Sequence, residues 1–175
     1  MIDALLAVSL FFQDSPEFSA GITPESVILS RGGKEVLRYQ REKPADSTLP
    51  VDSACYFHPL RTPSGQVVTD VSPSDHKHHR GIFLAWFDMH GKKDADFWGW
   101  GQFAPMKDRK IVSRKALASK TGDAPGLQLR NEWMAEDVLL LKEDLEAKVR
   151  QVETANVLDL VYTLTADADL RLRRC

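Results

Sequence analysis

The stretch Ser26-Val-Ile-Leu-Ser-Arg31, followed by Gly32-Gly33 and then by Lys34-Glu-Val-Leu-Arg-Tyr-Gln40, decides the fold class of this chain. Both flanking segments are rich in β-branched and large apolar residues, which favour strands. A two-residue Gly-Gly link supplies the positive φ angles that tight hairpin turns require. The sequence therefore predicts an antiparallel β-hairpin over residues 26–40.

Further strand-like segments follow this hairpin, separated by turn residues. They cover residues 54–60, 66–69, 81–87, 109–119, 127–134, 138–151 and 156–165. A helix over residues 135–154 is the alternative, but Leu145, Ala147 and Val149 alternate with polar residues, which favours a strand. We expect an all-β protein with an antiparallel β-sandwich and less than about a fifth of its residues in helices.

Composition limits the domain count and the classes of partner. The chain has 175 residues, of which 43% are hydrophobic, and this suits a single domain over residues 1–175. Its 23 basic and 25 acidic residues give a net charge of −2, which argues against a nucleic-acid partner. The two cysteines, Cys55 and Cys175, form no disulfide framework, and Cys55 is expected to be a buried, inert thiol.

The two ends of the sequence are unusual. Residues 4–12 are apolar but too short to cross a bilayer, so no membrane partner is expected. Residues 1–15 fit a degraded export signal or a first strand or helix, so periplasmic, secreted and cytoplasmic locations stay open. Residues 169–175 alternate like a strand, and we expect the domain to be truncated at its C-terminus.

The densest group of chemically active residues is Asp75-His76-Lys77-His78-His79-Arg80-Gly81. On an extended backbone His76 and His78 would project together and His79 would point away. Imidazoles act as general acids and bases near neutral pH, or as metal ligands. Because this motif precedes an apolar run, we expect it at the mouth of a concave pocket.

A second group is Asp94-Ala-Asp96-Phe-Trp98-Gly-Trp100-Gly101. Indole rings beside carboxylates can form a platform for sugars, so Asp96, Trp98, Trp100 and the nearby His58 are candidate substrate-binding residues. Burial of Trp98 and Trp100 in the core is an equally good interpretation, and Trp86 and Trp133 are expected in the core. The sequence lacks a Walker loop, a dinucleotide-binding glycine motif, a Gly-x-Ser-x-Gly elbow and a His-Glu-x-x-His motif.

The segment Tyr56-Phe-His-Pro-Leu-Arg-Thr-Pro-Ser-Gly65, with residues 75–83 and Asp96-Phe-Trp98, resembles the PmoA-like family over about residues 26–101. The resemblance implies a β-sandwich like that of the galactose mutarotase superfamily, incomplete in this chain, in bacteria that degrade polysaccharides.

Three functions are compatible with these observations. The first is a carbohydrate-active or sugar-binding protein, in which His76, His78, His79 and Asp75 perform acid–base chemistry and Arg80 binds an oxyanion or hydroxyl of a small sugar ligand. The second is an oxygenase-like protein with iron or copper bound by His76, His78 and Asp75, with the cofactor itself unknown. The third is a structural module without chemistry. The sequence leaves the oligomeric state open.

Overall fold

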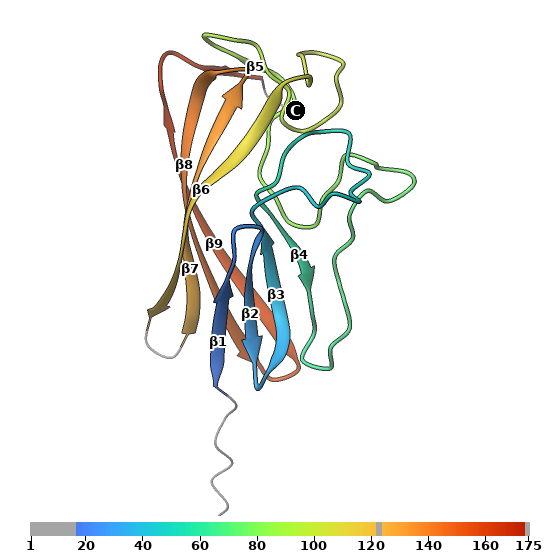
Figure 1. Cartoon of the computed structure of the whole chain (residues 1–175), viewed down its shortest axis with the longest axis vertical. Coiled ribbons are helices and arrows are strands. Elements are labelled where there is room, and N and C mark those ends of the chain that lie inside the picture. The colour runs from blue at the N-terminus through green and yellow to red at the C-terminus, as the bar shows by residue number, and fades with distance from the viewer. Residues whose placement is uncertain (1–16, 122–123, 174–175) are drawn as a thin grey trace, which may run out of the picture.

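The computed structural model describes residues 17–121 and 124–173, and within these ranges the chain is all β, without a helix. Two four-stranded antiparallel sheets face each other (Figure 1). The first contains the strands β1 (Phe18–Ile22), β2 (Ser26–Arg31), β3 (Lys34–Gln40) and β4 (Tyr56–Leu60). The second contains β6 (Arg109–Thr121), β7 (Ala124–Ala135), β8 (Val138–Val152) and β9 (Ala155–Ala166). The predicted antiparallel, sandwich-like fold is thus confirmed.

The β2–β3 hairpin is formed as the sequence predicts. Its turn consists of Gly32 and Gly33, whose φ angles are 55° and 76°. An L-residue is disfavoured at such angles, whereas glycine is not. The hairpin pairs Arg31 with Lys34 and Val27 with Tyr39, so the inward side chains of both strands reach the same core.

The second sheet consists of long strands in sequence order. In β8, buried residues such as Leu141, Leu145 and Val149 alternate with exposed ones. This two-residue period confirms the strand and excludes the helix considered for residues 135–154. Glu136 and Glu153 lie in the tight turns on either side of β8 with positive φ.

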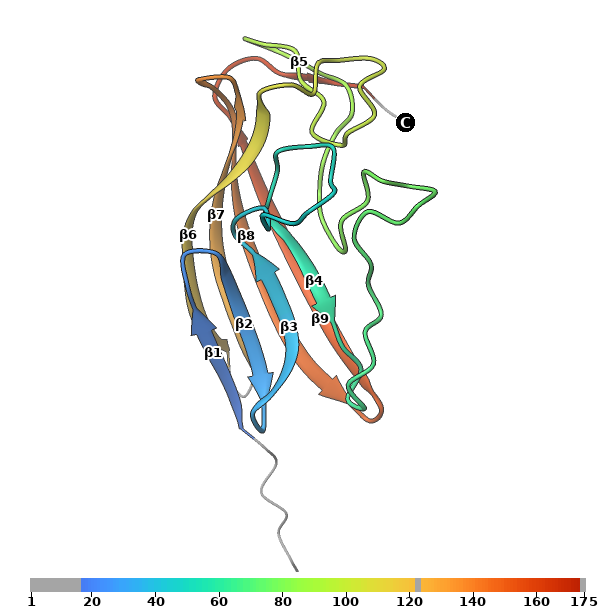
Figure 2. The same ribbon diagram turned by 45° about the vertical axis from the view of Figure 1, so that its right-hand side comes forward.

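The core lies between the sheets and continues beneath the loops. Trp133, Tyr39, Leu37 and Phe57 are among its fully buried side chains. The long loops between β4 and β6 gather along β4 and at one end of the sandwich (Figure 2). That end of the second sheet is therefore covered by loops, and these loops carry the candidate site.

Three predicted strands are wrong or shorter than expected. Residues 66–69 contribute only a bridge between Val67 and Arg61. Residues 81–87 form a loop whose only bridge joins Ile82 to Phe57, because Gly81 turns the backbone with a φ of 59°. Of the segment predicted over residues 169–175, the part described up to residue 173 is strand only at β10 (Arg171–Leu172), which pairs with β5 (Met89–His90). The apolar side chains of residues 81–87 pack onto the core from a loop.

Cys55 is buried and free, and burial raises the pKa of its thiol to about 12, as expected for an inert cysteine. Trp133 is buried as predicted, and Trp86 is half-buried against it. The export signal proposed for residues 1–15 and the cysteine at position 175 lie outside the described residues. The extent of the domain stays a prediction. Within the described ranges no helix is long and apolar enough to cross a membrane.

Candidate functional site

The histidine motif lies in a folded loop, not on an extended strand. The amide of His76 donates to the carbonyl of Pro73 at 3.1 Å, and the amide of His79 donates to that of His76 at 2.9 Å. A bridge between Val71 and Arg80 closes the loop. The expectation that His79 points away from His76 and His78 is therefore wrong, because two successive turns bring the three side chains round to one side.

The three imidazole rings contact each other. His76 stacks on His79 with 4.8 Å between the ring centroids, and His78 meets His79 edge-on at 4.5 Å. His76 is exposed, whereas His78 and His79 are half-buried. The motif therefore presents a single imidazole surface with His76 at its exposed end.

The two tryptophans are carried by a loop that Asp96 holds in place. One carboxylate oxygen of the buried Asp96 accepts the amide of Gly99 at 2.7 Å, and the other accepts the amide of Gly101 at 2.6 Å. A Cβ at Gly99 would lie 3.0 Å from the Cβ of His78. Glycine at this position therefore lets the tryptophan loop approach the histidine loop closely.

Eight rings from the two loops and their neighbours make continuous contacts. We call this group the aromatic cluster; it consists of His76, His78, His79, Phe83, Phe87, Trp98, Trp100 and Phe103. Trp100 and Phe103 are 44% and 46% exposed, so the cluster reaches the surface. Exposed large apolar groups that adjoin one another are typical of binding sites.

The sequence interpretation missed the three phenylalanines of the cluster. Phe83 and Phe87 lie in the segment 81–87, for which the sequence predicts a strand, and Phe103 lies outside every predicted element. Phe83 contacts Trp98 at 5.1 Å between centroids, and Phe87 contacts both Trp100 and Phe103. The sequence does show that phenylalanines are frequent after residue 80. It does not show which of them lie in the core and which at the surface.

The hydrogen bond between Trp100 and His78 fixes a tautomer. The indole Nε1–H of Trp100 donates to Nε2 of His78 at 3.2 Å. Since an indole only donates, neutral His78 carries its proton on Nδ1. Burial lowers the pKa of His78, and the neighbouring His79 and His76 lower it further. His78 is therefore neutral at pH 7 and offers one N–H donor.

Asp75 orients His76. A carboxylate oxygen of Asp75 lies 3.0 Å from Nδ1 of His76. This hydrogen bond lowers the pKa of Asp75, so the carboxylate stays charged and accepts the Nδ1–H. In neutral His76 the lone pair is then on the exposed Nε2, which is the arrangement of a general base.

Arg80 lies beneath the cluster. Its side chain is fully buried, donates from Nη2 to the carbonyl of Phe97 at 3.0 Å and covers the ring of Phe83 at 4.0 Å. Burial lowers the pKa of its guanidinium to about 10. The structure thus gives Arg80 and Asp96 supporting positions, and neither presents a free surface to a ligand.

His58 is separate from the cluster. Its Nδ1 lies 3.0 Å from the hydroxyl of Thr69, and burial lowers its pKa. Within the described residues no ring contact joins His58 to the eight rings of the cluster. The structure therefore brings together His76, His78, His79, Trp98 and Trp100, but it leaves His58 outside.

The described structure contains no group of side chains that could bind a metal ion as the second hypothesis requires. Across residues 17–121 and 124–173, no three His, Cys, Asp or Glu side chains are arranged to hold a metal ion. Of the ring nitrogens, Nδ1 of His76 already has Asp75 as a partner and Nε2 of His78 has Trp100.

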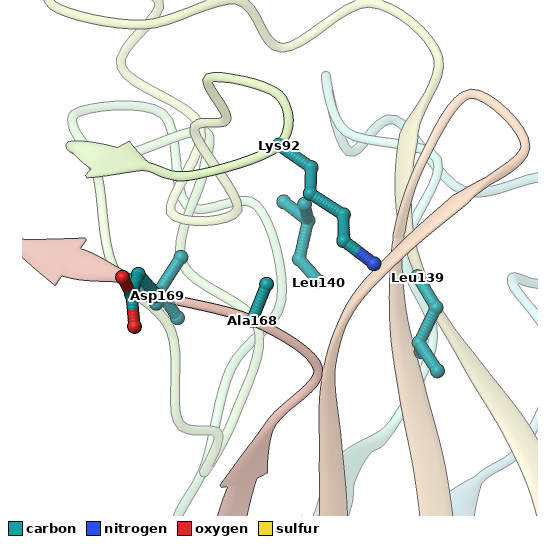
Figure 3. Close-up of a pocket in the computed structure, with 6 residues that line it drawn as sticks. Lys92, Leu139, Leu140, Ala168 and Asp169 are labelled. Atoms are coloured by element: carbon teal, nitrogen blue, oxygen red, sulfur yellow. The ribbon is translucent and has the colours of Figure 1, made fainter.

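A small hollow lies elsewhere, between β8, the loop after β5 and the segment after β9 (Figure 3). It is too narrow to admit a water molecule. Its lining consists of Lys92, Leu139, Leu140, Ala168, Asp169 and Leu170. It includes no residue of the aromatic cluster, so the concave pocket expected at the histidine motif stays a prediction.

Comparison with known proteins corrects the expected family. A model of a family of unknown function, DUF6807, matches residues 26–174, which include the aromatic cluster and most of both sheets. No curated protein and no solved structure matches the sequence. The resemblance to the PmoA-like family and to the mutarotases is therefore wrong: it rested on short motifs within residues 26–101, whereas this match spans nearly the whole chain. The chain belongs to DUF6807, a family of unknown function.

Proposed function

We propose that the chain binds a carbohydrate at the aromatic cluster and that His76 transfers protons at a sugar hydroxyl. The observation that carries the proposal is the contact between the half-exposed Trp100 and His78, whose ring also adjoins those of His76 and His79. Pyranose C–H faces pack on indole rings, while neighbouring imidazoles bond the hydroxyls. The cluster combines both kinds of group.

The two polar residues with defined hydrogen bonds have different roles in this proposal. His78 is neutral at pH 7 because its pKa is lowered, and its Nδ1–H donates to a sugar oxygen. His76 keeps its Nδ1 on Asp75 and uses the exposed Nε2 as the proton acceptor. In the ring opening of a reducing sugar, Nε2 of His76 takes the proton of the anomeric hydroxyl and the resulting imidazolium returns it to the ring oxygen, while the Nδ1–H of His78 stabilises the charge that develops on that oxygen.

Binding is tested by titrating neutral mono- and oligosaccharides while tryptophan emission and the melting temperature are followed. A ligand that binds the folded state raises the melting temperature by mass action. Replacing Trp100 by alanine is expected to weaken binding about tenfold, which corresponds to about 1.4 kcal/mol. Leu117→Ala is the matched control, because Leu117 is also an exposed apolar residue, at 43%, but lies on β6.

Chemistry is tested separately from binding. Proton NMR of the bound reducing sugar follows the exchange of its anomers, which His76→Gln should slow strongly while the Kd changes less than about threefold. His90→Gln is the control, since His90 also has a carboxylate at Nδ1, at 2.9 Å from Asp94, and lies outside the cluster. Equal rates in wild type and His76→Gln would remove the acid–base role, and failure of every sugar to bind would remove the proposal.

A further inference from the structure

The sandwich has four edge strands, and three of them are protected against pairing. β1 and β4 are five residues long, and β4 contains Pro59. β6 carries five Lys and Arg residues and a register shift between Ser113 and Lys115. Short length, proline, basic residues and bulges are the features by which natural sheets prevent edge-to-edge association.

The fourth edge, β9, has none of these features. It runs for 12 residues, Ala-Asn-Val-Leu-Asp-Leu-Val-Tyr-Thr-Leu-Thr-Ala, without Pro, Gly, Lys or Arg, and Asp159 is its only charged residue. Its pairing with β8 has no register shift. Within the described residues no strand pairs with its other side. β9 is therefore a long, regular and unprotected edge.

The side chains of β9 add apolar surface to this edge. On the inner face Leu158, Leu160, Tyr162 and Leu164 pack against the core but stay half-buried. On the outer face Val161 is 60% exposed, the highest value among the exposed large hydrophobic residues of the described chain. An exposed β-branched residue in the middle of a strand suits a cross-strand apolar pair.

The hairpin turn determines which backbone groups are free. Val152 pairs with Ala155 across a two-residue turn, so Ala155 and every second residue after it direct their N–H and C=O groups to β8. The alternate residues, from Asn156 to Ala166, direct theirs away from the sheet. These groups form a continuous row on the outer side of β9.

We propose that β9 pairs antiparallel with β9 of a second copy of this chain, with the two-fold axis at Val161. In this register Val161 faces Val161 of the second copy at a non-hydrogen-bonded position, where side chains are closest. Leu160 faces Tyr162 and Leu158 faces Leu164 on the inner face. Both faces of the strand are thus self-complementary in an antiparallel arrangement.

Charge also permits this register. Asp159, which Arg150 contacts at 3.2 Å, faces the neutral Thr163 of the second copy. No pair in the register brings like charges directly opposite each other, an arrangement that destabilises sheets. A basic edge such as that of β6 would place lysines or arginines against one another in many registers.

The size of the contact predicts a weak dimer. Twelve residues at about 3.4 Å each give a strand about 40 Å long, and a sheet thickness of about 10 Å then gives about 400 Å² per copy. The total of about 800 Å² is below the range of about 1,200–2,000 Å² for stable interfaces and falls in that of weak, transient ones. We therefore expect a dissociation constant in the micromolar range and a monomer–dimer equilibrium that depends on concentration.

Size-exclusion chromatography with light scattering tests the dimer. The mass of the full chain should rise from 19.7 kDa toward twice that value as its concentration increases from about 1 to about 500 μM. Val161→Lys places two like charges opposite each other and should weaken association at least about tenfold. Glu146→Lys, on the neighbouring strand opposite Val161, adds the same side chain away from the edge and should leave the dimer intact.

Cross-linking tests the register itself. In a Cys175→Ser background, Val161→Cys should give a disulfide-linked dimer under mild oxidation, since facing Cβ atoms in an antiparallel pair lie within disulfide reach. Thr163→Cys, which faces Asp159 of the second copy, should not. A monomer at every concentration, a dimer insensitive to Val161→Lys, or equal cross-linking of both cysteine variants would overturn the proposal.

Discussion

Replacing Asp96 by asparagine tests how the tryptophan loop is held. The substitution keeps the size of the side chain but leaves only one acceptor oxygen. In the wild type the two carboxylate oxygens accept the amides of Gly99 at 2.7 Å and Gly101 at 2.6 Å. In the variant a side-chain NH₂ must face one of these N–H groups, so one hydrogen bond is lost and two donors oppose each other.

The expected magnitude follows from the burial of Asp96, whose side chain is fully enclosed. A hydrogen bond to a charged group contributes about 1.5–3 kcal/mol, and an unsatisfied buried donor costs about 1–3 kcal/mol. We expect Asp96→Asn to lower the free energy of unfolding by about 2–4 kcal/mol. Because Trp100 lies between the two bonded amides and Trp98 directly precedes the first, their contacts with His78 should loosen as well.

Urea unfolding followed by far-ultraviolet circular dichroism measures this loss. Asp94→Asn is the matched control: this carboxylate is 55% exposed and contacts only the half-buried His90. Its replacement should change stability by less than about 0.5 kcal/mol. If Asp96→Asn were as stable as Asp94→Asn, the buried carboxylate would not hold the loop.

Three further predictions have defined outcomes. Gly81→Ala should destabilise by more than about 2 kcal/mol in urea unfolding, because its Cβ would lie 2.1 Å from the carbonyl oxygen of Phe57 at a φ of 59°. Because the pKa of His78 is lowered, its contribution to the free energy of unfolding is present above pH about 6.5 and is lost as the pH falls below this value. Protonation of His78 also removes the acceptor for the indole N–H of Trp100, so indole emission should change over the same fall in pH. Burial raises the pKa of Glu143, so its contribution to the free energy of unfolding is present below pH 4.5 and is lost as the pH rises. Glu143→Gln should remove this dependence of the free energy of unfolding on pH.

Each of these predictions has a control. Gly33→Ala also sits at a positive φ, of 76°, but its Cβ would meet nothing within 4 Å, so it should cost only about 1 kcal/mol. His90→Gln should not alter the acid dependence of indole emission, and Glu146→Gln should keep the wild-type change of stability above pH 4.5. If a variant and its control had the same stability or the same pH dependence, the physical cause given for that variant would be contradicted.

The strands of the second sheet were predictable from sequence because their burial alternates locally. Leu145, Ala147 and Val149 face the core, and the residues between them are exposed or half-buried. The run after Gly81 was not predictable in this way. Its residues are apolar without a clear period, and whether such a run forms a strand or packs as a loop depends on distant partners.

The candidate site was predictable in composition but not in geometry. The spacing of His76, His78 and His79 predicts that their side chains point in two opposite directions. In the structure the pairing of Val71 with Arg80 folds the loop, and the three rings contact each other. The burial of Arg80 could not be anticipated either, since arginine is seldom fully enclosed. The role of Asp96 had a local signal, because an aspartate followed within a few residues by glycines is typical of a turn in which the carboxylate accepts backbone amides.

The binding of sugar at the aromatic cluster is tested most directly by the indole N–H resonances of the four tryptophans. In a titration of uniformly ¹⁵N-labelled protein with oligosaccharides, the signals of Trp98 and Trp100 should shift in a saturable manner. Those of Trp86 and Trp133, which contact each other in the core, should not move. Unchanged Trp98 and Trp100 signals at saturating sugar, or equal shifts of all four, would contradict the account.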